Sequence, residues 1–509
     1  MLEIAWNPAL SRESSVGRMS IDKHLVLEKF NQAISGDLDS FLLQNFFASD
    51  NDSLSAAILG KVSEDNTIRL ISEMISLRNF ALRDGRLILP KAIKAETIEL
   101  FEIYQRFGLV GPDAINKTIF ISDIFNFRTI FYEIKNNQSI FNKLYKLDPY
   151  QHFSSLINMA LQKDILLVSP TIEAVKSVSE RFNDKTEFRN LLVELMPNKS
   201  LNKYPRVLIP IKSLKDLNNR VTIKKKIKDA IDFRYSISQS YEGMLFIQFT
   251  KGIGGTGNFI LNDNYDLLKE TKDTVPLKDI MGFLEWLNEK NAVYGIEITP
   301  FLSIDTSYSC GVVMTYEEIG IIGMREQIMG KNKSFLGFRI NRNQSHKLTS
   351  TDEVDISFQL AQYFHSKKFY TPCGITFGVD FFKYKEYKQQ LALGVSEVNV
   401  RMDGTMPYMG LFYKFPRWRE LLIQNKVSIE LRNNILVKKS IGSIDEVVNL
   451  LLRENIDVAD LCSPYGVVLL TPLIKFRNNQ FLFMGFCEKT DEERDNLINR
   501  VSQILSKKN

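Results

Sequence analysis

Residues 374–382 read Gly-Ile-Thr-Phe-Gly-Val-Asp-Phe-Phe, and after a polar turn a second strand-like stretch reads Ser-Glu397-Val-Asn399-Val-Arg401. In an extended strand, residues two apart share a face, so the glutamate, asparagine and arginine project together while the valines face the core. If the two strands pair as a hairpin, Asp380 lies beside that row. Two carboxylates and an amide oxygen suit Mg²⁺, and an arginine supplies charge for a phosphate or an oxyanion. The alternative, a polar strand face in water, would more often carry Lys, Thr or Ser without this order.

A glycine-rich loop precedes these strands. Residues 251–258 read Lys-Gly-Ile-Gly-Gly-Thr-Gly-Asn, and glycines let backbone N–H groups approach an anion closely. The loop matches G-x-G-x-x-G, but strands at 244–250 and 259–261 flank it and no helix follows, so a Rossmann site is excluded; no Gly-Lys-Ser/Thr closes a Walker A loop. The pattern predicts a flap between antiparallel strands that can fold over a triphosphate. A plain glycine-rich hairpin is the alternative.

Composition limits the class of protein. The 509 residues are 44% hydrophobic and 25% charged, which is typical of a globular chain with a large core. The net charge of +5 and one short basic run, 224–226, lack the dense basic stripe of a nucleic-acid binder. No apolar run approaches the ~18 residues that span a bilayer, and residues 1–6 do not begin a secretory signal. The four cysteines have no C-x-x-C spacing, which argues against a zinc site or disulfides. We therefore expect a cytoplasmic protein with no nucleic-acid or membrane partner.

The chain is predicted to contain three regions. Residues 1–180 indicate a parallel α/β layer, in which a buried strand at 165–168 leads into a helix begun by Ser169-Pro170. Residues 181–415 are dominated by antiparallel strands. Residues 416–509 form a small α+β tail, with a capping box at Ser443-Ile-Asp-Glu before a helix.

Together these motifs resemble the ATP-grasp superfamily of carboxylate ligases. The matches, in chain order, are Asn183-Asp184-Lys185, the flap at 252–258, the Gly-Val-Asp380-Phe strand and the Ser396–Arg401 strand. The resemblance covers about 160 to 411. It implies an ATP-grasp fold, of the α/β and α+β classes, in which two α+β subdomains clasp ATP behind an N-terminal Rossmann-like pre-ATP-grasp domain.

The resemblance also implies residue roles. Asp380, Glu397 and Asn399 look like magnesium ligands, and Arg401 looks like the arginine that stabilises phosphate and the intermediate. Residues that resemble the family's nucleotide contacts are Lys185, Gln248, Lys251, Gly254, Gly255, Gly257, Thr299, Phe301 and Leu302.

Two positions depart from the family pattern. Many members carry a phosphate-binding lysine on the strand that enters the flap, where this chain has Gln248, with Lys251 three residues on. The usual acidic residue at the adenine linker is replaced by Thr299, although Glu297 is close.

The C-terminal tail narrows the resemblance to pheganomycin-type peptide ligases. Residues 466–474 and 481–494 resemble the C-terminal domain of that group, and residues 323–327 resemble a substrate-side segment. Arg325 within that segment is a candidate for holding a substrate carboxylate in a bidentate fork, and a surface salt bridge is the alternative. No covalent nucleophile is required, and the four histidines have no partnered serine or cysteine motif.

The implied activity is ATP-dependent ligation with ATP and Mg²⁺ as cofactors. An amino-acid carboxylate attacks the γ-phosphate, and an amine then displaces phosphate from the acyl phosphate to form a peptide or amide. A thiol of an acyl carrier protein is the alternative nucleophile. A nucleotide-binding module without chemistry is a further alternative, which the complete Asp380, Glu397, Asn399 and Arg401 set argues against. The chain has neither the carrier-domain motif nor the flap lysine of a biotin-type carboxylase, which argues against that function. The expected partners are a small amino-acid or peptide substrate and, as is common among such ligases, a second copy in a homodimer.

Overall fold

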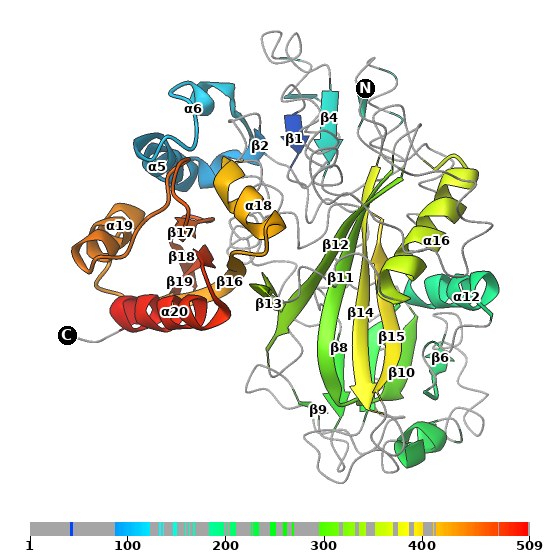
Figure 1. Cartoon of the computed structure of the whole chain (residues 1–509). Helices are drawn as coiled ribbons and strands as arrows, with labels where there is room; N and C mark the ends of the chain where they lie inside the picture. Colours follow the sequence, from blue (N-terminus) through cyan, green and yellow to red (C-terminus); the bar gives the residue numbers. More distant parts are fainter. Residues whose placement is uncertain are drawn as a thin grey trace.

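The computed structural model describes the chain in segments, drawn in colour in Figure 1. The longer described segments are 87–122, 184–197, 204–209, 245–250, 295–314, 319–330, 335–342, 352–369, 375–385, 391–400, 414–476 and 478–506. The shorter ones are 41–43, 132–133, 136, 146–149, 158, 162, 166–167, 182, 201, 225, 227–233, 258–261, 267–268 and 411. The flap residues 251–257, Arg401 and the helix predicted after Ser169-Pro170 (except Phe182) lie outside them.

The first unit is a parallel sheet with the strand order β3-β2-β1-β4-β5. All of its described pairings are parallel. Strand order reverses beside β1, as in doubly wound α/β folds, and the predicted parallel layer is confirmed. The elements are β1 Phe41–Leu43, β2 Leu87–Pro90, η1 Lys91–Ile93, α5 Lys94–Arg106, α6 Ala114–Lys117, β3 Ile119–Ile121, β4 Lys146–Pro149 and β5 Leu166–Leu167.

A small antiparallel sheet follows, with the strand order β6-β10-β7-β8-β9. Its strands are β6 Val207–Ile209, β7 Leu245–Phe249, β8 Asn258–Leu261, β9 Leu267–Leu268 and β10 Ile296–Pro300. β7 pairs antiparallel with β8 and sets Gln248 opposite Asn258. The two strands that flank the glycine loop are therefore a hairpin pair, as the sequence predicts.

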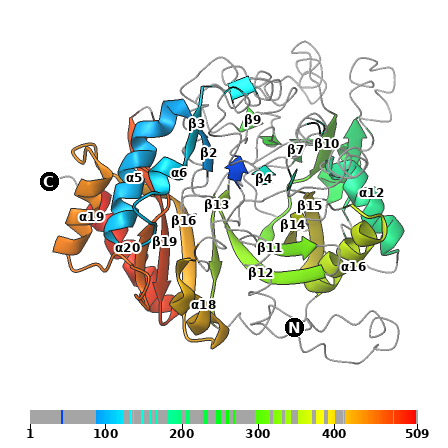
Figure 2. The same ribbon diagram turned by 90° about the horizontal axis from the view of Figure 1, so that it is seen from above.

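The largest sheet is antiparallel and has the order β15-β14-β11-β12-β13-β16-β19-β17, with β18 beside β19. Its first half consists of β11 Ile304–Met314, β12 Ile319–Met329, β13 Phe335–Ile340, β14 Ile375–Lys385 and β15 Leu391–Asn399. Its second half consists of β16 Ser428–Val437, β17 Gly466–Leu469, β18 Ile474–Phe476 and β19 Asn479–Glu488. In Figure 2 the first half lies beside α16 and the second beside α20. The combination of parallel and antiparallel sheets confirms the predicted α/β and α+β classes.

One face of the first half is an apolar core. Met324, Cys310, Val379 and Val398 are cross-strand partners in a single row and all are buried. Helices α12 Lys185–Leu195 and α16 Asp352–Ser366 contribute to the same hydrophobic cluster. Because side chains alternate along a strand, the residues next to this row face the other side of the sheet.

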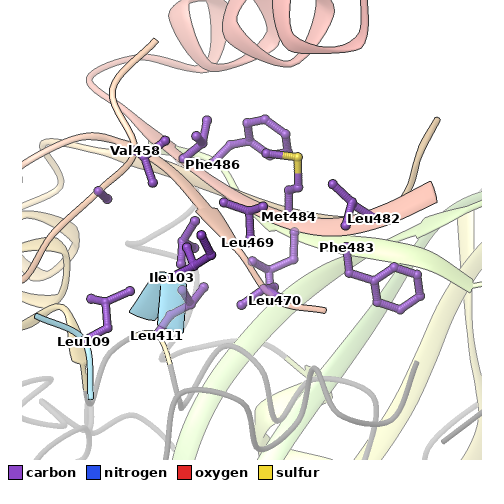
Figure 3. Packing of buried hydrophobic residues seen from close by; sticks show 14 of the residues in the cluster. Ile103, Leu109, Leu411, Val458, Leu469, Leu470, Leu482, Phe483, Met484 and Phe486 are labelled. Atoms are coloured by element: carbon purple, nitrogen blue, oxygen red, sulfur yellow. The ribbon is translucent and has the colours of Figure 1, made fainter. Parts of the chain in front are cut away.

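The C-terminal unit shares a core with the parallel sheet unit. Its helices are α18 Pro416–Ile423, α19 Ile444–Arg453 and α20 Asp491–Ser506. Figure 3 shows Ile103 of α5 facing Leu469 and Leu470 within this cluster. The Tyr104 hydroxyl also donates a hydrogen bond to the Leu469 carbonyl at 2.6 Å. Among the described residues, no helix has the length and apolar character needed to cross a membrane.

The predicted capping box at the start of α19 is present in a shifted form. The Ser443 hydroxyl accepts a hydrogen bond from the Glu446 backbone N–H at 3.2 Å, as an N-cap does. The Glu446 carboxylate accepts from the backbone N–H of Gly442 at 2.9 Å, one residue before the cap. Both polar ends of the motif are satisfied, so the helix begins where the sequence predicts.

A buried charge cluster lies where the two halves of the large sheet meet. Glu430 of β16 and Arg494 of α20 are almost fully buried, and Arg494 Nε lies 3.3 Å from Glu430 Oε2. Arg432 also pairs with Glu430. Across the strand boundary, Arg339 of β13 pairs with Glu326 of β12 at 2.5 Å. One ion pair thus joins β12 to β13, another joins β16 to α20, and β13 and β16 are neighbouring strands.

The pKa of Glu430 predicts how stability depends on pH. Burial raises this pKa above its ordinary value of 4.5, although Arg432 and Arg494 act to lower it. A raised pKa means that Glu430 contributes stability that is fully present below pH 4.5 and is lost as the pH rises through its folded-state value. We expect wild type to lose unfolding free energy relative to Glu430→Gln over that rise, as measured by urea unfolding. The exposed Glu420→Gln is the control, and equal slopes for wild type and both variants would contradict the expectation.

Gly337 is required where β13 meets β16. Its φ is +146°, and an added Cβ would overlap the carbonyl oxygen of Leu431. We expect Gly337→Ala to lower the free energy of unfolding by roughly 2 kcal/mol or more, because strain and steric overlap add. Chemical denaturation measures this change. The control is Gly442→Ala, whose new Cβ would meet only the Glu446 side chain, at 3.6 Å; an equal effect in both variants would count against the assignment.

Candidate functional site

The candidate site lies on the face of the large sheet opposite α16. Arg325 of β12, Ser309 of β11, Asp380 of β14 and Glu397 of β15 are successive cross-strand partners. Cross-strand partners in an antiparallel sheet share a face. The predicted hairpin pairing of the two acidic strands is thus confirmed, and it adds Arg325 to the same row.

The carboxylates and the amide predicted as metal ligands converge. The Asn399 amide nitrogen lies 3.1 Å from Asp380 Oδ2 and 3.3 Å from Glu397 Oε1. On the other side, the Gln327 side chain donates to Asp380 Oδ1 at 3.0 Å. Both oxygens of Asp380 are therefore held by amide groups, which fixes the direction of this carboxylate.

This donor set fits a hard divalent cation. Mg²⁺ prefers oxygen ligands in proteins. Asp380 and Glu397 provide carboxylate oxygens, and the Asn399 side chain provides an amide oxygen when it rotates so that its oxygen and nitrogen exchange places. Among the described residues, no group of three or more His, Cys, Asp or Glu side chains forms a metal site. The candidate site is instead a pair of carboxylates, Asp380 and Glu397, with the Asn399 amide between them.

Lys185 reaches this set from the start of α12. Its Nζ lies 2.8 Å from Glu397 Oε2, and its side chain is only 8% exposed. A cation at a helix N-terminus is unfavourable because the helix dipole is positive there. Asp184, whose side chain caps the helix by accepting from the Thr186 N–H at 3.0 Å, and Glu397 compensate for that cost. The start of α12 therefore places the Lys185 ammonium beside Glu397 in the row of cross-strand partners.

A second cation on α12 enters a buried network. Arg189 pairs with Glu297 of β10, and both side chains are 3% exposed or less. Gln248 of β7 donates to the same Glu297 carboxylate at 2.7 Å, and Arg206 lies 3.6 Å from it. Burial alone would lower the pKa of Arg189, but Glu297, together with Tyr204 and Glu397, outweighs it and this pKa is raised. Arg189 is therefore charged at every physiological pH.

The segment predicted to bind adenine, residues 299–302, follows Glu297 in the chain. Glu297, which is close to Thr299 in sequence, is directed into the Arg189 network and not toward the linker. Thr299 is paired with Phe246 of β7, and Leu302 is buried in a cluster that includes Phe382. Phe301 is partly buried beside it. The roles of Thr299, Phe301 and Leu302 in binding adenine remain predictions.

A strip without side chains borders the acidic row. Gly323, Gly311 and Gly378 are cross-strand partners on β12, β11 and β14, and Asn399 continues the same row on β15. Each glycine is two residues from a member of the Arg325–Glu397 row, so it lies on the same face. Beside the carboxylates, the backbone of three adjacent strands therefore carries no side chain of its own on this face.

Sequence reasoning missed three residues of this site. Arg189 lies one helical turn after Lys185, and this i, i+4 spacing could have indicated a shared face. Glu297 was considered only for adenine, since its partner is 108 residues away in the chain. Gln327 lies two residues after Arg325 on the same strand face, and alternation could have placed it.

No family model matches the sequence, and a search of curated proteins finds no match. The three-dimensional structure is similar to solved structures at low sequence identity. N5-carboxyaminoimidazole synthase from Aspergillus clavatus, in complex with ADP and 5-aminoimidazole ribonucleotide, has a TM-score of 0.48 and 8% identity, covering 92% of this chain and 99% of that one. The biotin carboxylase domain of Hydrogenobacter thermophilus 2-oxoglutarate carboxylase, solved with MgADP, ADP and bicarbonate, has a TM-score of 0.49 and 9% identity, covering 91% and 89%. At such low identity, the chemistry of this chain has to be inferred from its own residues.

The donor set predicts a divalent-cation site that variants can test. We expect Asp380→Asn and Glu397→Gln each to weaken Mn²⁺ binding in the presence of ADP by about tenfold or more, because each removes one anionic ligand. Isothermal titration calorimetry measures the affinity. The control is Asp355→Asn, an exposed carboxylate on α16, which covers the opposite face. Unchanged Mn²⁺ affinity in both site variants would rule out this assignment.

Proposed function

We propose that the chain is an ATP-dependent ligase of the ATP-grasp type, which activates a carboxylate as an acyl phosphate and releases ADP. The observation that carries the proposal is the convergence of Asp380, Glu397 and Asn399 on one sheet face, with Lys185 2.8 Å from Glu397. Acidic and amide ligands beside a buried ammonium form a site for a metal-bound polyphosphate. The similar solved structures that contain ADP agree with this assignment but do not carry it.

Phosphoryl transfer requires positioning and charge neutralisation more than covalent help from the protein. Bound Mg²⁺ would supply much of that neutralisation at Asp380, Glu397 and Asn399. The Lys185 ammonium lies where it can exchange its contact with Glu397 for one with a phosphate oxygen. We assign Arg401 to the developing charge, and the flap residues Lys251, Gly254, Gly255 and Gly257 to the phosphates.

The acid substrate is placed beside the nucleotide in this proposal. Arg325 stands two strands from Asp380 in the same row and can hold a carboxylate in a bidentate fork. The strip formed by Gly323, Gly311 and Gly378 gives the substrate access to the sheet backbone. We infer that the acid is an amino acid or a peptide.

An amine is the favoured nucleophile, and the product is then a peptide or an amide. A carrier-protein thiol would use the same acyl phosphate and is distinguished by its product. In this proposal residues 1–180 form the pre-ATP-grasp domain, 181–415 the ATP-grasp domain and 416–509 the C-terminal domain, of the kind found in pheganomycin-type ligases. The working enzyme would be a homodimer.

Trapping with hydroxylamine tests the function. The protein is incubated with MgATP, hydroxylamine and single amino acids, and ADP, phosphate and hydroxamate are measured. We expect ADP and an amino-acid-specific hydroxamate, because hydroxylamine intercepts an acyl phosphate. Glu397→Ala and Asn399→Ala should lower the rate by about a hundredfold or more, the effect typical of losing charge stabilisation at a reacting centre.

Asp355→Asn serves as the control and should leave the rate unchanged. AMP and pyrophosphate as products would contradict the proposal, since they indicate an acyl adenylate. MgATP binding without any turnover across amino acids, peptides and carrier protein would favour the non-catalytic module.

A further inference from the structure

The two cations of α12 contact carboxylates that belong to different sheets. Lys185 pairs with Glu397 on the large sheet, and Arg189 pairs with Glu297 on the small sheet. Residues four apart on a helix lie on one face, one turn above the other. This face of α12 therefore spans the boundary between the two sheets, which is where the proposed nucleotide site lies.

Arg189 contacts β15, the strand that carries Glu397, as well as the small sheet. Its Nη2 donates to the carbonyl of Ser396 at 3.4 Å, and Ser396 directly precedes Glu397. The Ser396 hydroxyl in turn donates to the backbone carbonyl of Asp380 at 3.2 Å. One guanidinium thus joins Glu297 to the backbone that carries both acidic ligands.

The start of α12 is also joined to the base of the flap. The Lys185 backbone N–H donates to the carbonyl of Thr250 at 2.8 Å, and Thr250 N–H donates to Gly295 O at 2.9 Å. Thr250 follows β7 directly and precedes the glycine loop. The helix therefore contacts β7 and β10 of the small sheet at one end of its face and β15 of the large sheet at the other.

The buried pair is a poor device for stability alone. Removing two charges from water is costly, and apolar replacements of buried ion pairs are often neutral or stabilising. Within the part of the chain that the structure describes, Nε of Arg189 also has no hydrogen-bond acceptor. The contacts of Arg189 with Glu297 and with the Ser396 carbonyl instead place this guanidinium beside the acidic row.

We infer that Arg189, anchored by Glu297, is a positioning residue that sets Lys185 and Glu397 at the correct separation for a metal-bound nucleotide. Gln248 orients Glu297 from the flap strand by its hydrogen bond of 2.7 Å. The inference rests on the proposed function. It adds a pair of residues that touch neither the metal nor the substrate but determine where the groups that do so lie.

The test measures binding of MnADP and, separately, steady-state kinetics. We expect Arg189→Met and Glu297→Gln each to weaken MnADP binding by about tenfold or more, as is typical for residues that orient metal ligands. They should lower kcat and raise the KM for ATP while leaving the KM for the acid substrate unchanged. Arg189→Lys keeps the charge but cannot bridge two acceptors with a planar fork, so it should restore only part of the affinity.

The control is Glu353→Gln, another buried carboxylate, which pairs with Lys383 at 3.1 Å on the α16 side of the large sheet. It should lower the melting temperature without changing MnADP affinity. The double variant Arg189→Met/Glu297→Gln should lose no more affinity than the worse single variant, because both act through one contact. If Arg189→Met does not fold, the isosteric Glu297→Gln and the charge-keeping Arg189→Lys carry the test.

The possible results distinguish failure of the proposed function from failure of the positioning role. Wild-type protein that binds no MnADP would overturn the proposed function itself. If wild type binds MnADP and folded Glu297→Gln and Arg189→Lys bind it with the same affinity, the positioning role is wrong. The proposed function is not affected by that result.

Discussion

The antiparallel pairing of β14 with β15, which sets Asp380 opposite Glu397, is the constraint on which the rest of the site depends. A slip of one residue would turn every side chain of a strand to the other face. The buried partners Val379 and Val398 oppose such a slip, since it would place valines on the polar face and carboxylates against α16. The apolar core therefore holds the two acidic side chains in register from the opposite face of the sheet.

Charge is concentrated in two buried networks with different positions in the fold. The network around Glu430 and Arg494 connects the C-terminal helix to the large sheet, far along the strand order from β15. The network around Arg189 and Glu297 connects the two sheets beside the acidic row. Both place arginine where a planar, always charged group contacts several acceptors at once. Only the second lies where its geometry bears on the proposed nucleotide.

Local patterns in the sequence predict the parts of this structure that local physics determines. Alternation along 396–401 correctly predicts that Val398 faces the core and that Glu397 and Asn399 share the other face, and the spacing after Ser443 predicts where α19 begins. Alternation along one strand does not predict which other strand or helix lies next to it. Glu297 of β10 meets Arg189 of α12 although the two residues are 108 positions apart. Arg401 and the flap glycines lie outside the described residues, so their roles remain predictions.

The glutamine at position 248 has a physical explanation in the same network. Glu297 already faces two cations, Arg189 and Arg206, and a lysine on β7 would set a third beside one carboxylate. In a buried setting that excess of positive charge would be costly unless a phosphate were always present. An amide donates the same kind of hydrogen bond to Glu297 without adding charge. Gln248 therefore suits a position beside a carboxylate that two arginines already neutralise. Lys185, in contrast, contacts Glu397 in the row of cross-strand partners.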